Sequence, residues 1–172
     1  AVRTLGHLLG VKPEICAVRP GWVDATDLLG FFDPLQRIFV PGPFSDFLHD
    51  CKKNPGRAGI FCLDELNISR MENYGSDLLT AIGQQGVKLR LYPESIHKSL
   101  WTEFDHLQSG ENDDTKLLDG EKVARVELLK ENLGSFSYQM EFPEESILTG
   151  TLNTDFSTNQ LSPKIIDRSY IL

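Results

Sequence analysis

Two adjacent carboxylates follow an unbroken apolar run near the middle of the chain. Residues 60–63 are all apolar, and Asp64 and Glu65 come directly after them. A short apolar run without alternation is typical of a strand buried on both faces of a parallel sheet, and such sheets bind ligands outside the carboxyl ends of their strands. The apolar run therefore delivers Asp64 and Glu65 to the place where a phosphate ligand would bind. The alternative is a buried strand that ends in a solvated Asp-Glu turn.

A second strand-like run ends in a polar amide. Residues 147–152 are followed by Asn153. An Asn at the tip of the strand beside Asp64 can reach both the attacking water and the terminal phosphate of a nucleotide, so Asn153 is a candidate sensor of the nucleotide. An Asn that ends a strand often makes a turn and nothing more, and this alternative stays open.

A short helix is expected near the end of the chain. Ser162 suits a helix N-cap and Pro163 suits the first helical position, which places Arg168 near the end of that helix. In a ring of subunits such an Arg can reach the neighbouring nucleotide and stabilise charge in the transition state. The alternative is an Arg that neutralises the helix C-terminus.

Together these segments resemble the AAA+ ATPases, and within them the McrB-like group, the GTPase subunits of modification-dependent restriction, with its MoxR and dynein-related relatives. The matching blocks agree in order and spacing, which is more specific than any single motif. They are Val18-Arg19-Pro20-Gly21-Trp22, Asp27-Leu28-Leu29-Gly30, Leu63-Asp64-Glu65-Leu66-Asn67 with Arg70, Gly150-Thr151-Leu152-Asn153-Thr154-Asp155 and Ser162-Pro163-Lys164-Ile165-Ile166-Asp167-Arg168.

The resemblance implies roles for the site residues. Asp64 and Glu65 take the places of the Walker B acids, with Asp64 on the metal and Glu65 catalytic. Asn153 corresponds to the sensor 1 residue, Arg168 corresponds to the arginine finger, and Asn67 joins the catalytic residues of the nucleotide site. The resemblance covers most of the chain except roughly residues 86–146. We interpret that segment as a family-variable insertion that carries partner or substrate specificity.

The phosphate-binding loop of this family is missing from the sequence. No Gly-x-x-x-x-Gly-Lys-[Ser/Thr] motif occurs in the 172 residues, so the residues that bind the nucleotide phosphates are unknown. The chain starts without Met, and residues 1–10 resemble the helix that follows this loop. We therefore expect a fragment that starts just after the Walker A loop, although a parent without the loop is an alternative. Mg²⁺ and ATP or GTP are the expected cofactors of the full-length parent, and none is expected in the fragment.

The predicted fold class is α/β, a three-layer P-loop NTPase core that is incomplete at both ends and occupies residues 1–172 as a partial AAA+ domain. Its central parallel strands are expected at residues 14–18, 60–63 and 147–152. By resemblance these are the second, third and fourth strands of the family's sheet, which lie side by side. The first strand would pair on the far side of residues 147–152, and its absence leaves an exposed sheet edge.

A hairpin insert is expected in the second helix of the family's fold. Turn residues bound the segment 30–43, which carries residues 38–40 as its return strand. The resemblance implies that this insert faces the ring channel. Phe31, Phe32 and Arg37 are then candidate contacts for a protein or nucleic-acid substrate. The alternative is that both phenylalanines pack inside the hairpin.

The remaining elements are predicted from periodicity and turn residues. Ser69 is expected to cap one helix whose apolar positions run from residue 71 to residue 82. Further elements follow: a half-exposed strand at residues 87–92, helices at 95–107 and 121–133, a polar loop at 109–114, and a strand at 136–142.

Composition limits the function classes. The net charge of −8 argues against broad nonspecific nucleic-acid binding. No apolar stretch approaches the roughly 20 residues that a membrane span needs, and no signal peptide is visible, so we predict a cytoplasmic protein without membrane partners. Cys16, Cys51 and Cys62 lack the spacing of zinc ligands.

Two function classes remain open from the sequence. The first is a piece of a ring-forming NTPase that hydrolyses ATP or GTP to drive remodelling or translocation, in a restriction-like or other defence system. Its partners are the other subunits of a homo-oligomeric ring, and the isolated chain is expected to be inactive. The second is a non-hydrolysing scaffold or interaction module that kept the same architecture.

Overall fold

A three-stranded parallel sheet lies at the centre of the chain. The computed structural model describes residues 2–56, 59–83, 87–109, 119–155 and 158–167. The sheet contains β1 (Glu14–Ala17), β4 (Ile60–Asp64) and β7 (Ile147–Gly150) in the order β1-β4-β7. Both pairings are parallel, with Cys16 opposite Leu63 and Cys62 opposite Thr149. The chain is therefore a mixed α/β protein, and the expected side-by-side parallel strands are confirmed.

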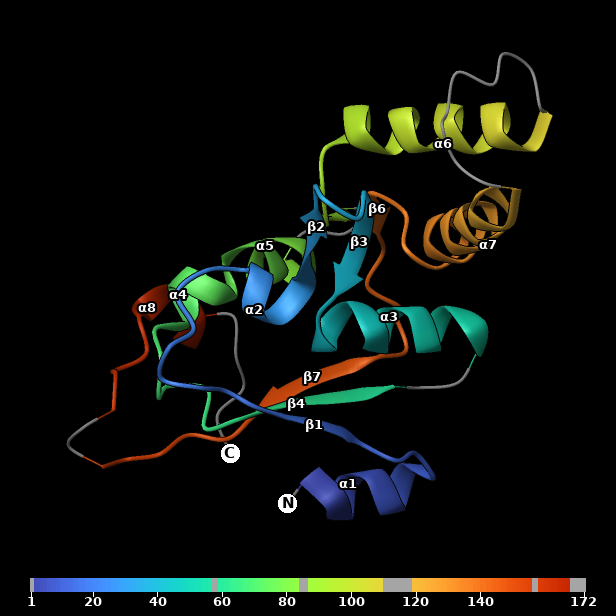
Figure 1. Ribbon diagram of the computed structural model, residues 1–172. Coiled ribbons are helices and arrows are strands. Elements are labelled where there is room, and N and C mark those ends of the chain that lie inside the picture. Colours follow the sequence, from blue (N-terminus) through green and yellow to red (C-terminus); the bar gives the residue numbers. More distant parts are fainter. Residues whose placement is uncertain (1, 57–58, 84–86, 110–118, 156–157, 168–172) are drawn as a thin grey trace.

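The central strand is the most deeply buried, as its unbroken apolar sequence predicted. The first four residues of β4 are all at most 1% exposed. On one face the ring of Phe61 packs against Phe44 and Phe47, at centroid distances of 4.9 Å and 5.2 Å. Both belong to α3 (Pro43–Lys53), which begins at a proline and so loses no helical hydrogen bond there. Figure 1 shows α3 lying along this face of the sheet.

The predicted hairpin precedes α3 and follows the short helix α2 (Thr26–Leu29). Its strands are β2 (Gly30–Asp33) and β3 (Ile38–Pro41), which pair antiparallel. Gly30 has a positive φ of 91°, and a Cβ there would lie 2.2 Å from the carbonyl oxygen of Val40. Glycine is therefore required where the chain leaves α2 and enters the hairpin.

Two long helices form a second buried cluster. They are α6 (Glu94–Ser109) and α7 (Asp119–Ser135), and Leu100, Phe104, Leu129 and Leu133 pack between them. The short antiparallel pair β5 (Leu89–Arg90) and β6 (Gln139–Met140) connects the helices to the rest of the chain. The two predicted strands are thus present but shorter than expected. Most of the predicted polar loop lies outside the described residues.

The helical pair is fastened to the hairpin by side chains of α7. The Asn132 amide accepts a hydrogen bond from the backbone N–H of Phe39 (2.9 Å) and donates one to its carbonyl oxygen (2.7 Å). The Arg125 guanidinium donates to the carbonyl oxygen of Gln36 (2.7 Å) and pairs with Glu103. Figure 1 shows α6 and α7 on the hairpin side of the molecule, away from the sheet.

The segment after β4 differs from the prediction. We expected one helix capped by Ser69, but two helices form, α4 (Met71–Tyr74) and α5 (Ser76–Gly83), with a break at Gly75. The residue that caps α4 is Arg70, and it makes no side-chain capping bond. The Ser69 hydroxyl instead donates to the carbonyl oxygen of Trp22 at 2.6 Å. A tertiary contact therefore takes the hydroxyl that the local pattern assigned to the helix.

Two further helices lie near the ends of the described chain. The helix α1 (Val2–Leu9) precedes β1, and α8 (Pro163–Ile166) forms where the Ser-Pro pair predicted a helix start. None of the described helices is both long enough and apolar enough to cross a membrane.

Candidate functional site

The two predicted acids stand at the carboxyl end of the central strand. Asp64 is the last residue of β4 and is partly buried, whereas Glu65 follows it and is exposed. Glu65 has a φ of 54°, in the left-handed region that residues with a Cβ rarely adopt. Figure 1 shows β4 and β7 pointing the same way, toward α4 and α8. The acids are thus placed at the end of the sheet where α/β proteins bind ligands.

A threonine that the sequence did not single out joins the two acids. The Thr151 hydroxyl donates to Oδ1 of Asp64 at 2.6 Å and accepts from the backbone N–H of Glu65 at 2.8 Å. The backbone of Thr151 also bonds to the β4 segment on both sides, through Leu63 and Leu66 at 3.0 Å each. The sequence signals for Thr151 are its place in the expected strand at residues 147–152 and in the matching block at residues 150–155.

Asn67 is buried just after β4, and its side chain binds the backbone of the segment that follows β7. Its side chain is 6% exposed. Its amide nitrogen donates to the carbonyl oxygen of Asn153 (2.7 Å), and its amide oxygen accepts from the N–H of Asn153 (2.9 Å). The same nitrogen reaches the carbonyl oxygen of Asn159 at 3.2 Å. Both polar groups of Asn67 are therefore used to hold backbone, and its predicted catalytic role stays a prediction.

Asn153 follows β7 as expected and is partly exposed. Its side-chain oxygen accepts from the backbone N–H of Asp155 at 3.1 Å, the geometry of an Asx turn. Among the described residues none bonds its amide nitrogen. The turn that the sequence left open as an alternative is present, and the amide nitrogen can still donate to a ligand.

Tyr74 supports the loop that follows the acids. Its hydroxyl donates to the carbonyl oxygen of Leu66 at 2.7 Å, and its ring meets Trp22 edge-on at a centroid distance of 5.2 Å. Burial raises the pKa of Tyr74 well above its ordinary value, so the hydroxyl stays protonated and keeps its role as a donor.

The remaining predicted site residues are Arg168 and three residues of the hairpin. Arg168 lies outside the described residues, although the helix α8 before it is present. In the hairpin, Phe31 is 48% exposed, while Phe32 is partly buried and stacks on Tyr92 at a centroid distance of 6.1 Å. Arg37 pairs with Glu103 at 2.9 Å. Of the three residues proposed to face a ring channel, Phe31 is the one whose side chain is most clearly available.

The donor atoms at the strand end suit a magnesium ion that a nucleotide brings with it. Within the described chain, no group of three or more His, Cys, Asp or Glu side chains could hold a metal ion alone. Mg²⁺ in nucleotide sites is commonly held by one or two carboxylates together with substrate phosphates and waters. The bond from Thr151 uses Oδ1 of Asp64, and no described residue bonds to Oδ2. Asp64 therefore fits the part of a single protein carboxylate in such a shell.

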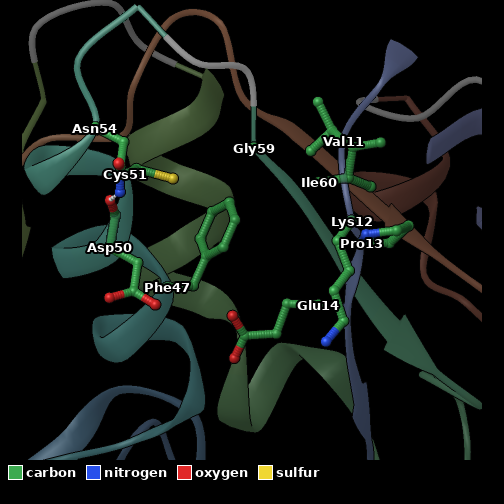
Figure 2. A pocket seen from close by; sticks show the side chains of 10 residues that line it. All are labelled: Val11, Lys12, Pro13, Glu14, Phe47, Asp50, Cys51, Asn54, Gly59 and Ile60. Carbon is green, nitrogen blue, oxygen red and sulfur yellow. Dashed lines mark hydrogen bonds between the residues drawn. The ribbon is translucent and has the colours of Figure 1, made fainter. Parts of the chain in front are cut away.

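A cavity of about 520 Å³ lies at the opposite end of the sheet, where β1 and β4 begin. Figure 2 shows Glu14 of β1 reaching toward α3, which carries Phe47, Asp50 and Cys51. Burial raises the pKa of the Glu14 carboxyl, and the nearby carboxylate of Asp50 raises it further. This cavity is separate from the two acids, and none of the predicted site residues lines it.

No family model matches the chain, and no curated protein or solved structure matches it either. The class of protein is therefore defined by the structure itself. It is a mixed α/β protein whose parallel sheet carries two acids, Asp64 and Glu65, at the carboxyl end of its central strand, and Thr151 bonds to both of them.

Proposed function

We propose that this chain is the part of an AAA+ NTPase that follows the phosphate loop, and that the whole protein hydrolyses ATP or GTP in a homo-oligomeric ring. The observation that carries the proposal is the position of Asp64 and Glu65. They end the buried central strand of a parallel sheet, and Asn153 follows the strand beside it. The resemblance to the McrB-like, MoxR and dynein-related branch rests on several sequence blocks, and two of them, residues 63–67 and 150–155, lie at this end of the sheet.

Each residue of the site has a distinct part in this proposal. Asp64 would hold the nucleotide's Mg²⁺ through the carboxylate oxygen that Thr151 leaves open. A Mg²⁺ ion held there would supply positive charge to neutralise the phosphate oxygens. Glu65 is exposed and can accept a hydrogen bond from a water, orienting it toward the terminal phosphate. The side-chain amide N–H of Asn153 would donate a hydrogen bond to the same water or to the phosphate, while Asn67 fixes the position of the Asn153 backbone.

The proposed partners follow from the ring. Arg168 would reach the nucleotide of the neighbouring subunit, as an arginine finger does. The exposed ring of Phe31 on the hairpin would contact a protein or nucleic-acid substrate. Work on such a substrate, by remodelling or translocation, is the expected outcome of hydrolysis.

A second candidate is a non-hydrolysing scaffold with the same architecture. No Gly-x-x-x-x-Gly-Lys-[Ser/Thr] motif occurs in these 172 residues, and a parent protein that lacks this loop as well would be such a scaffold. An intact phosphate loop in the full-length protein would support hydrolysis, whereas a degenerate loop would support the scaffold.

The test is Glu65→Gln in the full-length protein. Because Glu65 acts on water and Asp64 acts on the metal, this variant should lose hydrolysis while nucleotide binding and ring assembly persist. Calorimetry measures binding, phosphate release measures hydrolysis, and Glu14→Gln at the opposite end of the sheet is the matched control. Loss of binding together with hydrolysis would mean that the two acids have been assigned to the wrong roles.

A further inference from the structure

We propose that Thr151 is a positioning residue that sets the geometry of both acids at once. The inference rests on the proposed function, because it concerns how Asp64 and Glu65 are held for the reaction of a nucleoside triphosphate. Thr151 itself touches neither substrate nor metal in this proposal. It acts through the two residues that do.

The hydrogen bonds of the Thr151 hydroxyl are matched to this task. A hydroxyl has one proton to donate and lone pairs to accept. Its proton goes to Oδ1 of Asp64 at 2.6 Å, and its oxygen accepts from the N–H of Glu65 at 2.8 Å. One atom therefore ties the side chain of the first acid to the backbone of the second. Serine and threonine are the residues that offer a strong donor and a strong acceptor on one atom at this distance from the backbone.

The bond to Asp64 fixes which oxygen faces a ligand. An ionised carboxylate only accepts hydrogen bonds, and bonds to a charged acceptor are stronger than neutral ones. With Oδ1 held by Thr151, Oδ2 is the oxygen that no described residue occupies. The rotation of the carboxylate is thereby limited before any ligand binds, and preorganisation of this kind favours reaction.

The bond to Glu65 supports an unfavourable backbone conformation. Glu65 has a φ of 54°, where its Cβ is crowded by the backbone. Its N–H is held by a side chain 86 positions further along the chain. Without that acceptor the peptide between Asp64 and Glu65 keeps only the bond from the N–H of Val18 to the Asp64 carbonyl oxygen (3.0 Å), and the Glu65 carboxylate is held less firmly in its direction.

Thr151 keeps its place without its hydroxyl, which makes the inference testable. Its backbone N–H donates to the carbonyl oxygen of Leu63, and its carbonyl oxygen accepts from the N–H of Leu66. These bonds do not involve the side chain. Valine has nearly the shape of threonine, so Thr151→Val should fold and lose only the two hydroxyl bonds.

The experiment compares three variants of the full-length protein: Thr151→Val, Thr151→Ser and, as a matched control, Thr154→Val. Thr154 lies on the same segment and is exposed. The measurements are kcat, the Mg²⁺ concentration for half-maximal rate, and hydrogen exchange at the Glu65 amide. Thr151→Val should lower kcat or raise the Mg²⁺ requirement by about 10- to 100-fold, as the loss of outer-shell partners does. It should also expose the Glu65 amide to exchange.

Serine keeps the hydroxyl, so Thr151→Ser should keep kcat, the Mg²⁺ requirement and the exchange of the Glu65 amide within a few-fold of wild type, and Thr154→Val should match wild type. If wild type hydrolyses nucleotide and Thr151→Val matches it in kcat and Mg²⁺ dependence, the inference fails and the proposed function stands. Unchanged exchange of the Glu65 amide in Thr151→Val also overturns the inference. If the wild-type protein hydrolyses no nucleotide, the proposed function itself fails, and the role of Thr151 in it fails too.

Discussion

At the residue scale, Asn67 shows how a buried side chain can support a site by binding the backbone of another site residue. Its amide matches one donor and one acceptor of the Asn153 backbone, much as a strand neighbour would. Burial without such partners would carry a large desolvation penalty, so the pairing is what allows an amide to be 6% exposed. The sequence block that suggested chemistry for Asn67 is thus also explained by its support of Asn153.

His97 is a second residue whose environment fixes its state. The hydroxyl of Tyr92 donates to the carbonyl oxygen of Phe136 at 2.9 Å, so Nδ1 of His97 must supply the proton in its own 2.9 Å bond to that hydroxyl. The indole N–H of Trp101 donates to Nε2 at 3.2 Å, which requires that Nε2 carry no proton. The neutral ring with its proton on Nδ1 satisfies every bond.

This arrangement predicts a pH-dependent loss of stability. Burial lowers the pKa of His97 from its ordinary value of 6.5, while Glu94 opposes the shift and itself pairs with Lys98. Because the unfolded chain takes up the proton first, stability is full above about pH 6.5 and falls as the pH drops below it toward the lower folded pKa. Thermal unfolding of wild type and His97→Gln from pH 8 to pH 5 measures the effect. The difference between their melting temperatures should shrink on acidification, and a constant difference would contradict the prediction.

At the element scale, the sequence predicted the elements that neighbouring residues specify. The apolar run of β4 and the turn residues around the hairpin predicted these two elements at the positions where they are observed. The helix break at Gly75 was missed because the apolar spacing continues through it. Ser69 was misassigned because its partner, Trp22, lies 47 positions away. The role of Thr151 was invisible for the same reason, since it depends on which residues of β4 and β7 lie side by side.

The attachment of α7 to the hairpin is a testable feature at this scale. Asn132→Ala removes two bonds and leaves the N–H and the carbonyl oxygen of Phe39 without their partner, on a residue that is 0% exposed. Unpaired backbone groups of this kind typically lower stability by about 1–3 kcal/mol. Urea unfolding should show that loss for Asn132→Ala and almost none for Lys130→Ala, an exposed position on the same helix. Equal stabilities of the two variants would mean that the amide does not hold the hairpin.

At the scale of the whole molecule, the described chain separates two kinds of surface. The carboxyl ends of the strands carry the acids, whereas the hairpin and its two supporting helices lie apart from them (Figure 1). In the proposed ring, the first surface would serve the nucleotide and the second would serve a substrate. This division implies that some residues act within one subunit and others act between subunits.

Mixed rings of the full-length protein distinguish these two kinds of residue. Glu65 and Asn153 lie at one end of the same sheet, so both should serve the nucleotide of their own subunit. Arg168 should serve the neighbour's nucleotide, where an arginine finger changes the rate by about a thousandfold or more. Mixing inactive Glu65→Gln with inactive Arg168→Ala should restore part of the activity, because some sites combine an intact Glu65 with an intact Arg168 from the next subunit.

The matched control is a mixture of Glu65→Gln with Asn153→Ala. If both residues act within one subunit, as proposed, every site in these rings keeps one defect and no activity should return. A subunit that carries both Glu65→Gln and Arg168→Ala, mixed with wild type, gives an independent test of whether Arg168 acts between subunits. If Arg168 acts between subunits, each double variant silences its own site and the site of its neighbour, so activity falls more steeply than the fraction of variant added. A fall in simple proportion would mean that Arg168 is not an arginine finger, and it would favour the alternative that the charge of Arg168 neutralises a helix C-terminus.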